Sequence, residues 1–507
     1  MKVSVWKSLG LGVCCAAALV ASALAEEDAG QDDVARRTER ALFKMSQLEV
    51  GSKKVRVLTP ATPVNAQAPL VDPPAEMPED VELAPMLQGD ADAQPGASYH
   101  DPTLLDECGS GGCACGECGC GECDCCCDPC CDCLCGPPGN CWLRTEVLGW
   151  WTKGQRVPPL VTTGPDNTNP GVLGEPGTEV LFGGELINNK ARIGGRVTAG
   201  AWLDDCHVWG IEGDYFALDD IDQNFFASGL DYPFLSRPFI DVTNGLPGTP
   251  AVQGINNDDL CGQVTVLTNS GFQGAGLSLR RNLCCSTDCC DAGGSNPYNW
   301  NDWSSHCCTL DLIGGYRFYR LDDSVYVNEQ LMSIAQQGPV AFGTTFDITD
   351  RFRTRNEFQG GDIGLIGTAY RGAWSLEAMA KVALGNSHSK VRIQGSTTTT
   401  VPGQTPNTLE GGLLALPSNI GAYSRNDFAA IPQFTVRLGY QCNCHLRLLV
   451  GYDFLYWANV ARAADQIDLR VDTNQLPPGS PGDFPQFRYA DSNFWAQGIS
   501  GGAEIRW

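Results

Sequence analysis

Residues 142–507 contain repeated segments of about ten residues in which apolar and polar side chains alternate. In one of them, Leu448 and Val450 share a face, whereas Arg447 and Asp453 share the opposite one. Because successive side chains of a strand point to opposite faces, this pattern predicts β-strands with one apolar and one polar face. The predicted strands are 142–151, 190–203, 207–218, 270–281, 309–320, 361–370, 374–385, 431–441, 445–457 and 493–507.

The connections between these segments alternate between tight turns and long loops, as in outer-membrane barrels with short periplasmic turns and long external loops. The pattern predicts an all-β fold, an antiparallel up-and-down transmembrane β-barrel of 10 to 12 strands. The higher number applies if 325–334 and 342–352 also span the bilayer instead of forming an extra hairpin in a long loop. One connection, 282–308, is long on the predicted periplasmic side, and its cysteines could fold it compactly through disulfides.

The last segment has an apolar face that includes Ile499 and Ile505 and ends on Trp507. It resembles the C-terminal strand of bacterial outer-membrane barrels, although most of these end in Phe. The resemblance implies recognition by the barrel-insertion machinery and contact of the apolar face with outer-membrane lipid. Alternation alone also fits a soluble β-sandwich or barrel, but charges on the opposite face of nearly every strand favour the membrane barrel.

The N-terminus is typical of a secretory signal peptide, residues 1–25. Lys2 and Lys7 precede a short apolar run, and Ala23-Leu24-Ala25 matches a small-residue cleavage site. We therefore predict an exported protein of the cell outer membrane.

Two segments separate the signal peptide from the barrel. Residues 26–107 are acidic and rich in proline, which predicts a disordered N-terminal arm, apart from an amphipathic patch at 34–48 that favours a short helix. Residues 108–141 hold 14 of the 26 cysteines, several in CxxC spacing such as Cys115 and Cys118. In an exported chain we interpret this low-complexity segment as disulfide-forming, within the chain or with envelope partners. Metallothionein-like binding is the alternative.

The amino-acid composition disfavours two classes of function, nucleic-acid binding and catalysis. The formal net charge of −25 disfavours nucleic-acid binding, which needs a basic surface. The five histidines are scattered and lie in no nucleophile motif, so we predict no enzyme, no catalytic residue, no metal site and no cofactor. A barrel hydrolase with a site at the strand ends stays open as a minor alternative.

The polar face of the strands supplies the candidate functional residues. Charges inside a narrow barrel must pair or reach water. They would form either a salt-bridged plug or a narrow polar channel for small solutes. The predicted lumen-facing residues are Arg144, Glu146, Arg192, Arg196, Glu212, Asp214, Arg280, Asp311, Arg317, Glu377, Lys381, Arg437, Arg447, Asp453, Glu504 and Arg506. The aromatic residues expected in interfacial girdles are Trp150, Trp151, Tyr215, Tyr316, Tyr440, Tyr456, Trp457, Trp495 and Trp507.

Four runs, 142–148, 312–318, 352–358 and 450–457, resemble the β-barrel porin family of planctomycete bacteria, as does 459–478. The likeness covers 142–507 and implies an outer-membrane barrel, without a catalytic motif to transfer. Two functions follow: a porin-like passive channel or envelope-structural barrel, and a disulfide-crosslinked envelope protein that uses the barrel as an anchor.

Overall fold

The computed structural model describes residues 139–204, 207–285, 306–337, 339–476 and 481–507. The predicted signal peptide, the acidic arm with its helix at 34–48, and residues 108–138 of the Cys-rich segment lie outside the described residues. Most of the connection 282–308 lies outside them as well.

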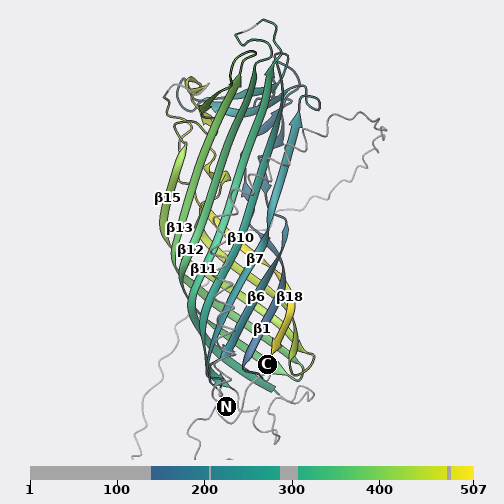
Figure 1. Ribbon diagram of the computed structural model, residues 1–507, viewed down its shortest axis with the longest axis vertical. Helices are drawn as coiled ribbons and strands as arrows, with labels where there is room; N and C mark the ends of the chain where they lie inside the picture. Colours follow the sequence, from purple (N-terminus) through teal and green to yellow (C-terminus); the bar gives the residue numbers. More distant parts are fainter. Residues whose placement is uncertain (1–138, 205–206, 286–305, 338, 477–480) are drawn as a thin grey trace, which may run out of the picture. The chain divides into compact units, whose positions relative to one another are not determined.

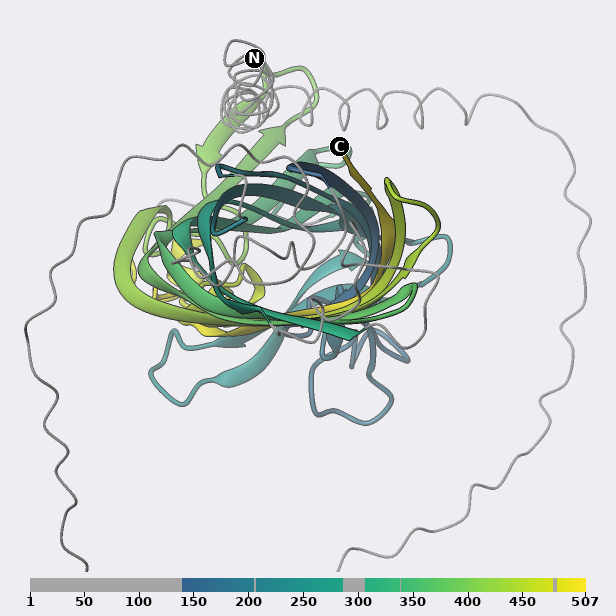
Figure 2. The same cartoon turned by 90° about the horizontal axis from the view of Figure 1, so that it is seen from below.

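Ten long antiparallel strands form a closed barrel (Figure 1). Each strand pairs with its neighbours in the chain, β1 pairs with β18, and β12 pairs with both β11 and β13, so the ring has no free edge (Figure 2). This confirms the predicted up-and-down barrel, and each predicted strand coincides with one barrel strand. The barrel strands are β1 Cys141–Thr152, β6 Ala191–Trp202, β7 Trp209–Ser228, β10 Leu260–Cys285, β11 His306–Ser333, β12 Thr345–Arg371, β13 Trp374–Thr400, β15 Gly421–Gln441, β16 Leu446–Val460 and β18 Ser492–Arg506.

The strand number is ten, and the alternative of twelve is wrong. Residues 325–333 and 345–352 are the far ends of β11 and β12, paired in the same register from His306↔Arg371 to Met332↔Thr345. They form neither a separate hairpin nor two further spanning strands. The reason is visible in the outward side chains of this part, such as Ser324 and Asn328, which are polar and suit water rather than lipid.

The two ends of the barrel differ. Short turns join β6 to β7, β12 to β13 and β15 to β16, and the C-terminus lies at the same end (Figure 1). The connections at the other end contain small elements of their own. These are β2 Gln155–Arg156, β3 Val161–Thr163, β4 Glu179–Phe182, β5 Leu186–Ile187, β8 Leu235–Asp241, β9 Thr249–Asn256, β14 Asn407–Glu410, η2 Ala464–Gln466, β17 Arg470–Val471 and η3 Thr473–Gln475.

Within the described ranges, no helix has the length and hydrophobicity needed to cross a membrane.

The outward face near the short-turn end carries an apolar belt. Along β13, side chains alternate between exposed apolar ones, from Trp374 and Leu376 to Leu384, and buried polar ones such as Glu377. The eleven residues from Trp374 to Leu384 cover about 25 Å of height if the strand is tilted by about 40°, which equals the apolar band of a membrane barrel. Other exposed members of the belt include Val147, Ile193, Leu279, Ile363, Val436, Val450, Ile499 and Ile505.

Val450 tests which face of the strands meets lipid, because it lies within the belt and is 64% exposed. Val450→Arg is expected to lower the free energy of unfolding by about 2–4 kcal/mol, because the lipid would have to accommodate a charge near its midplane. Val450→Leu, the matched control, should cost less than about 1.5 kcal/mol. The measurement is urea unfolding in phosphatidylcholine vesicles. Equal stabilities of the two variants would contradict an outward, lipid-facing Val450.

Candidate functional site

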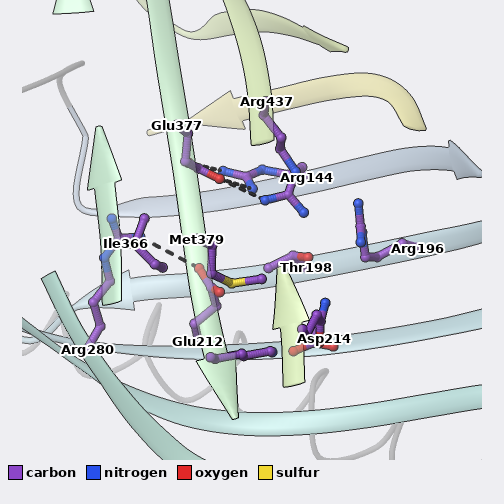
Figure 3. Close-up of a pocket in the computed structure, with 12 residues that line it drawn as sticks. Arg144, Arg196, Thr198, Glu212, Asp214, Arg280, Ile366, Glu377, Met379 and Arg437 are labelled. Carbon is purple, nitrogen blue, oxygen red and sulfur yellow. Dashed lines mark hydrogen bonds and ion pairs between the residues drawn. The ribbon is translucent and has the colours of Figure 1, made fainter. Parts of the chain in front are cut away.

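Near the short-turn end, charged side chains from opposite walls meet inside the barrel (Figure 3). Arg144 of β1 contacts Glu504 of the neighbouring β18 at 2.6 Å and Glu377 of β13 at 3.2 Å. β13 is not adjacent to β1 in the sheet order, so this second contact crosses the interior. Arg437 of β15 joins the same group through Glu377 Oε1 at 2.8 Å.

Arg196 of β6 links a second pair of walls. Its guanidinium donates to both carboxylate oxygens of Glu146 at 2.6 and 2.9 Å and to both oxygens of Asp453 at 2.9 and 3.1 Å. Arg437 contacts Glu146 as well, at 3.0 Å, so the two groups form one network. Such bidentate, charge-assisted hydrogen bonds fix the side chains in position as well as neutralising their charges.

A third group lies across β7, β11, β12 and β13. Arg317 contacts Asp214 at 2.7 Å and Asp362 at 3.0 Å, and Lys381 lies 3.6 Å from Asp362. Asp362 is not among the predicted lumen-facing residues, although it lies in a predicted strand and shares the inward parity of Ile366 and Thr368. Reading the parity of 361–370 would have found it.

The remaining predicted residues differ in their partners. Arg280 contacts Asp311 at 2.5 Å and lies over the rings of Trp142 and Trp202. Arg192 donates to the main-chain and side-chain oxygens of Ser270, not to a carboxylate. The buried members of the predicted set are Arg144, Glu146, Arg192, Arg196, Arg280, Asp311, Arg317, Glu377, Lys381, Arg437, Arg447, Asp453 and Glu504; Glu212, Asp214 and Arg506 are partly exposed.

A cavity of about 30 Å³ lies among the side chains of the charged network. This volume has room for about one or two water molecules. Its lining residues include Arg144, Arg196, Glu212, Asp214, Glu377 and Arg437 (Figure 3).

Further from the short-turn end, aromatic rings fill the interior. Phe272 of β10 lies 4.9 Å from Phe494 of β18, and Tyr319 of β11 lies 6.4 Å from Trp457 of β16, measured between ring centroids. These strands are not neighbours in the barrel, so the rings meet across it. We call this set the aromatic layer: Trp150, Phe216, Phe272, Tyr319, Phe358, Trp457 and Phe494, all buried.

The aromatic layer corrects two predicted girdle positions. Trp150 and Trp457 are 1% and 0% exposed and lie in the interior, whereas Trp151, beside Trp150 in the chain, is 44% exposed. Two consecutive strand residues cannot both face lipid, and Trp150 shares the parity of Arg144 and Glu146. Tyr316, Tyr440 and Trp507 are exposed, as girdle residues would be, and Tyr215, Tyr456 and Trp495 are half-buried.

At the long-loop end, parts of the connections pack against inward side chains of the strand ends, and we call these buried loop parts the loop cap. Arg237 of β8 contacts Glu329 of β11 at 2.5 Å and Asp350 of β12 at 2.7 Å, and all three side chains are fully buried. Asp350 also accepts hydrogen bonds from the main-chain N–H groups of Leu413, Leu414 and Ala415. This buried triad therefore ties two different loops to the strands.

The triad sits in an apolar cluster built by loops and strand ends together. Val161, Leu235 and Leu414 come from connections, while Val266 and Val327 come from β10 and β11. The segment after β16 also turns inward, where Arg462 contacts Asp323 at 2.5 Å. The alternating pattern does not predict these ion pairs, because their residues lie in segments predicted to be long loops.

Three histidines, His207, His388 and His445, contact amide or carbonyl groups. His388 Nδ1 lies 2.8 Å from Asn426 Oδ1, His445 Nδ1 lies 2.9 Å from the main-chain oxygen of Arg506, and His207 Nε2 lies 2.7 Å from Asn140 Oδ1. These contacts do not make the His–carboxylate pair of a general base. Among the described residues, no group of three or more His, Cys, Asp or Glu side chains could hold a metal ion. Six cysteines of the described part of the chain are free: Cys141, Cys261, Cys284, Cys308, Cys442 and Cys444.

A closed ring of tilted antiparallel strands with an apolar outer belt and an ion-paired interior defines a transmembrane β-barrel protein. The family described as "Putative beta barrel porin-7 (BBP7)" matches residues 142–507, and the chain belongs to this family.

The matches among solved structures include two bacterial proteins. The outer membrane protease OmpT from Escherichia coli is 11% identical with a TM-score of 0.33, and the match covers 73% of this chain and 97% of that one. The P. putida toluene transporter TodX is 9% identical with a TM-score of 0.19, and the match covers 73% and 91% of the two chains. A search of curated proteins gave no match.

Proposed function

We propose that this protein is an outer-membrane barrel with a closed lumen, which anchors its exported N-terminal segments in the cell envelope. The observation that carries the proposal is the filling of the interior at three successive levels: the charged network, the aromatic layer and the loop cap around Arg237. A passive pore needs a continuous polar path wide enough for a solute and its water. Aromatic rings that contact one another across the barrel support a blocked path at their level.

In this proposal, the barrel anchors the N-terminal segments that precede it in the chain. The chain enters the barrel at Cys141, at the end with the short turns, which is the periplasmic end in barrels of this type. The Cys-dense segment directly precedes this point in the sequence. In our proposal, its thiols crosslink the protein to itself or to Cys-rich envelope partners.

Conductance of the intact, folded protein in planar bilayers tests the closed lumen. We expect no steady conductance steps from preparations in which a heat-modifiable gel band shows that the barrel is folded and a general porin conducts in parallel. Reproducible steps from the folded protein would overturn the closed barrel and favour the passive channel for small solutes.

Non-reducing gels of envelope fractions test the crosslinking. The native chain is expected to run as multimers that collapse to monomer with a thiol reductant. The control is a variant with every cysteine from Cys108 to Cys135 replaced by serine, which leaves the barrel unchanged and should run as monomer throughout. A native chain that is monomeric without reductant would contradict the anchor proposal.

A further inference from the structure

Beyond the apolar belt, the outer wall of the barrel carries a cluster of basic side chains, which we call the basic wall. It consists of Arg351, Arg353 and Arg355 of β12 and Lys390 and Arg392 of β13. In the strand register Arg353 lies directly opposite Arg392, and Arg355 lies opposite Lys390. On each strand these residues share the parity of exposed belt residues, so their side chains lie on the outer face.

The centre of the basic wall is not neutralised by the protein. Among the described residues, Arg355 contacts Asp322 at 2.8 Å and Lys390 lies 3.6 Å from Glu357, but Arg353 and Arg392 form no ion pair. Arg351, Arg355 and Arg392 are all close enough to Arg353 to repel its charge.

Adjacent arginines without an ion pair are unexpected in a chain with a net charge of −25. Like charges directly opposite each other on paired strands are destabilising. An external anion that binds between Arg353 and Arg392 would remove this repulsion. Guanidinium groups suit phosphate and carboxylate especially well, because two N–H groups can donate to one anion in parallel.

The height of the basic wall above the apolar belt indicates which kind of anion can reach it. Phe428 of β15, which is 75% exposed, pairs with Asn386, and Asn386 pairs with Gln359; this row marks the upper edge of the belt. The Arg353–Arg392 pair lies six residues further along β12, which corresponds to about 15 Å of height at a tilt of about 40°. The headgroup layer of ordinary phospholipids is only about 5–8 Å thick on each side of a bilayer.

We propose that the basic wall binds the phosphate or carboxylate groups on the sugar headgroup of an acidic outer-leaflet glycolipid. The proposal rests on an outer-membrane location with the long loops outward, but not on whether the lumen is closed. An extended sugar headgroup carries anionic groups at the height of Arg353 and Arg392, which a glycerophospholipid phosphate does not reach. The apolar belt below would contact the acyl chains of the same lipid.

Binding of lipopolysaccharide with a phosphorylated core to the full-length protein in neutral detergent tests the proposal. The variant R353Q/R392Q is expected to bind at least ~10-fold more weakly, because two charge-assisted contacts are lost. The control R156Q/R488Q removes the same charge from two exposed loop arginines and should keep the native affinity. Heat-modifiable gel mobility shows that both variants fold.

Three results would overturn the proposal. One is native affinity in R353Q/R392Q, and another is an equal loss in R156Q/R488Q, which would indicate unspecific attraction to positive charge. The third is binding of phosphatidylglycerol vesicles as tight as that of the core-bearing lipid, which would indicate an ordinary phospholipid. The proposal is supported if the native protein binds the complete lipopolysaccharide tightly. Lipopolysaccharide stripped of its core phosphates should then bind weakly, whether or not Arg353 is present.

Discussion

Arg196→Met is expected to lower the free energy of unfolding by about 3–5 kcal/mol, because the buried Glu146 and Asp453 lose their closest cation and keep only Arg437, at 3.0 and 3.9 Å. Within this network, Arg196 alone donates hydrogen bonds to both oxygens of Glu146 and to both oxygens of Asp453. Methionine keeps a similar volume, so the loss measures charge rather than packing. The measurement is urea unfolding of the protein refolded into lipid vesicles.

A triple variant separates the two explanations for such a loss. R196M/E146Q/D453N removes the cation and both of its carboxylate partners, and it should regain a large part of the stability lost in R196M, since replacing a buried ion group by neutral groups is often close to neutral. If R196M is as stable as the native protein, the cross-barrel network does not stabilise the barrel. If the triple variant is less stable than R196M, shape rather than charge is the cause.

Arg237→Met is expected to have an effect of similar size, about 3–5 kcal/mol, with a different location. It would leave Glu329 and Asp350 unpaired in an apolar cluster, with Gln253 as a remaining partner of Glu329 at 3.0 Å. Because Asp350 also holds the main chain at Leu413 and Leu414, the loop between β13 and β15 should open. Limited proteolysis of the folded protein, with fragment masses determined, would detect faster cleavage within 401–420.

The matched control is Arg488→Met, which removes the same group from an exposed loop position. It should change the free energy of unfolding by less than about 0.5 kcal/mol, as for most surface changes. It should also leave the cleavage pattern unchanged. Unchanged cleavage in R237M would show that the buried triad does not hold the loop cap in place.

The parity rule explains where prediction from the sequence was strong. A barrel strand has period two, so an outward Val450 requires an inward Asp453, and the ten alternating segments were identified from this pattern. The same rule, applied to Trp150 and Trp457, assigns both to the interior, and their placement in girdles ignored it. Aromatic residues favour interfaces on average, but strand parity decides the individual case.

The sequence by itself determined the class of fold, the number of the alternating segments and the polar or apolar character of each strand face, because these depend on neighbours two positions apart. Only the tertiary structure decided which charges pair, since Arg144 and Glu377 are separated by 233 positions and by several strands. It also decided that β11 and β12 continue past the belt and that Arg237, in a loop, pairs with Glu329 and Asp350 of these two strands. Contacts across a barrel depend on strand tilt and register, and no local pattern encodes these.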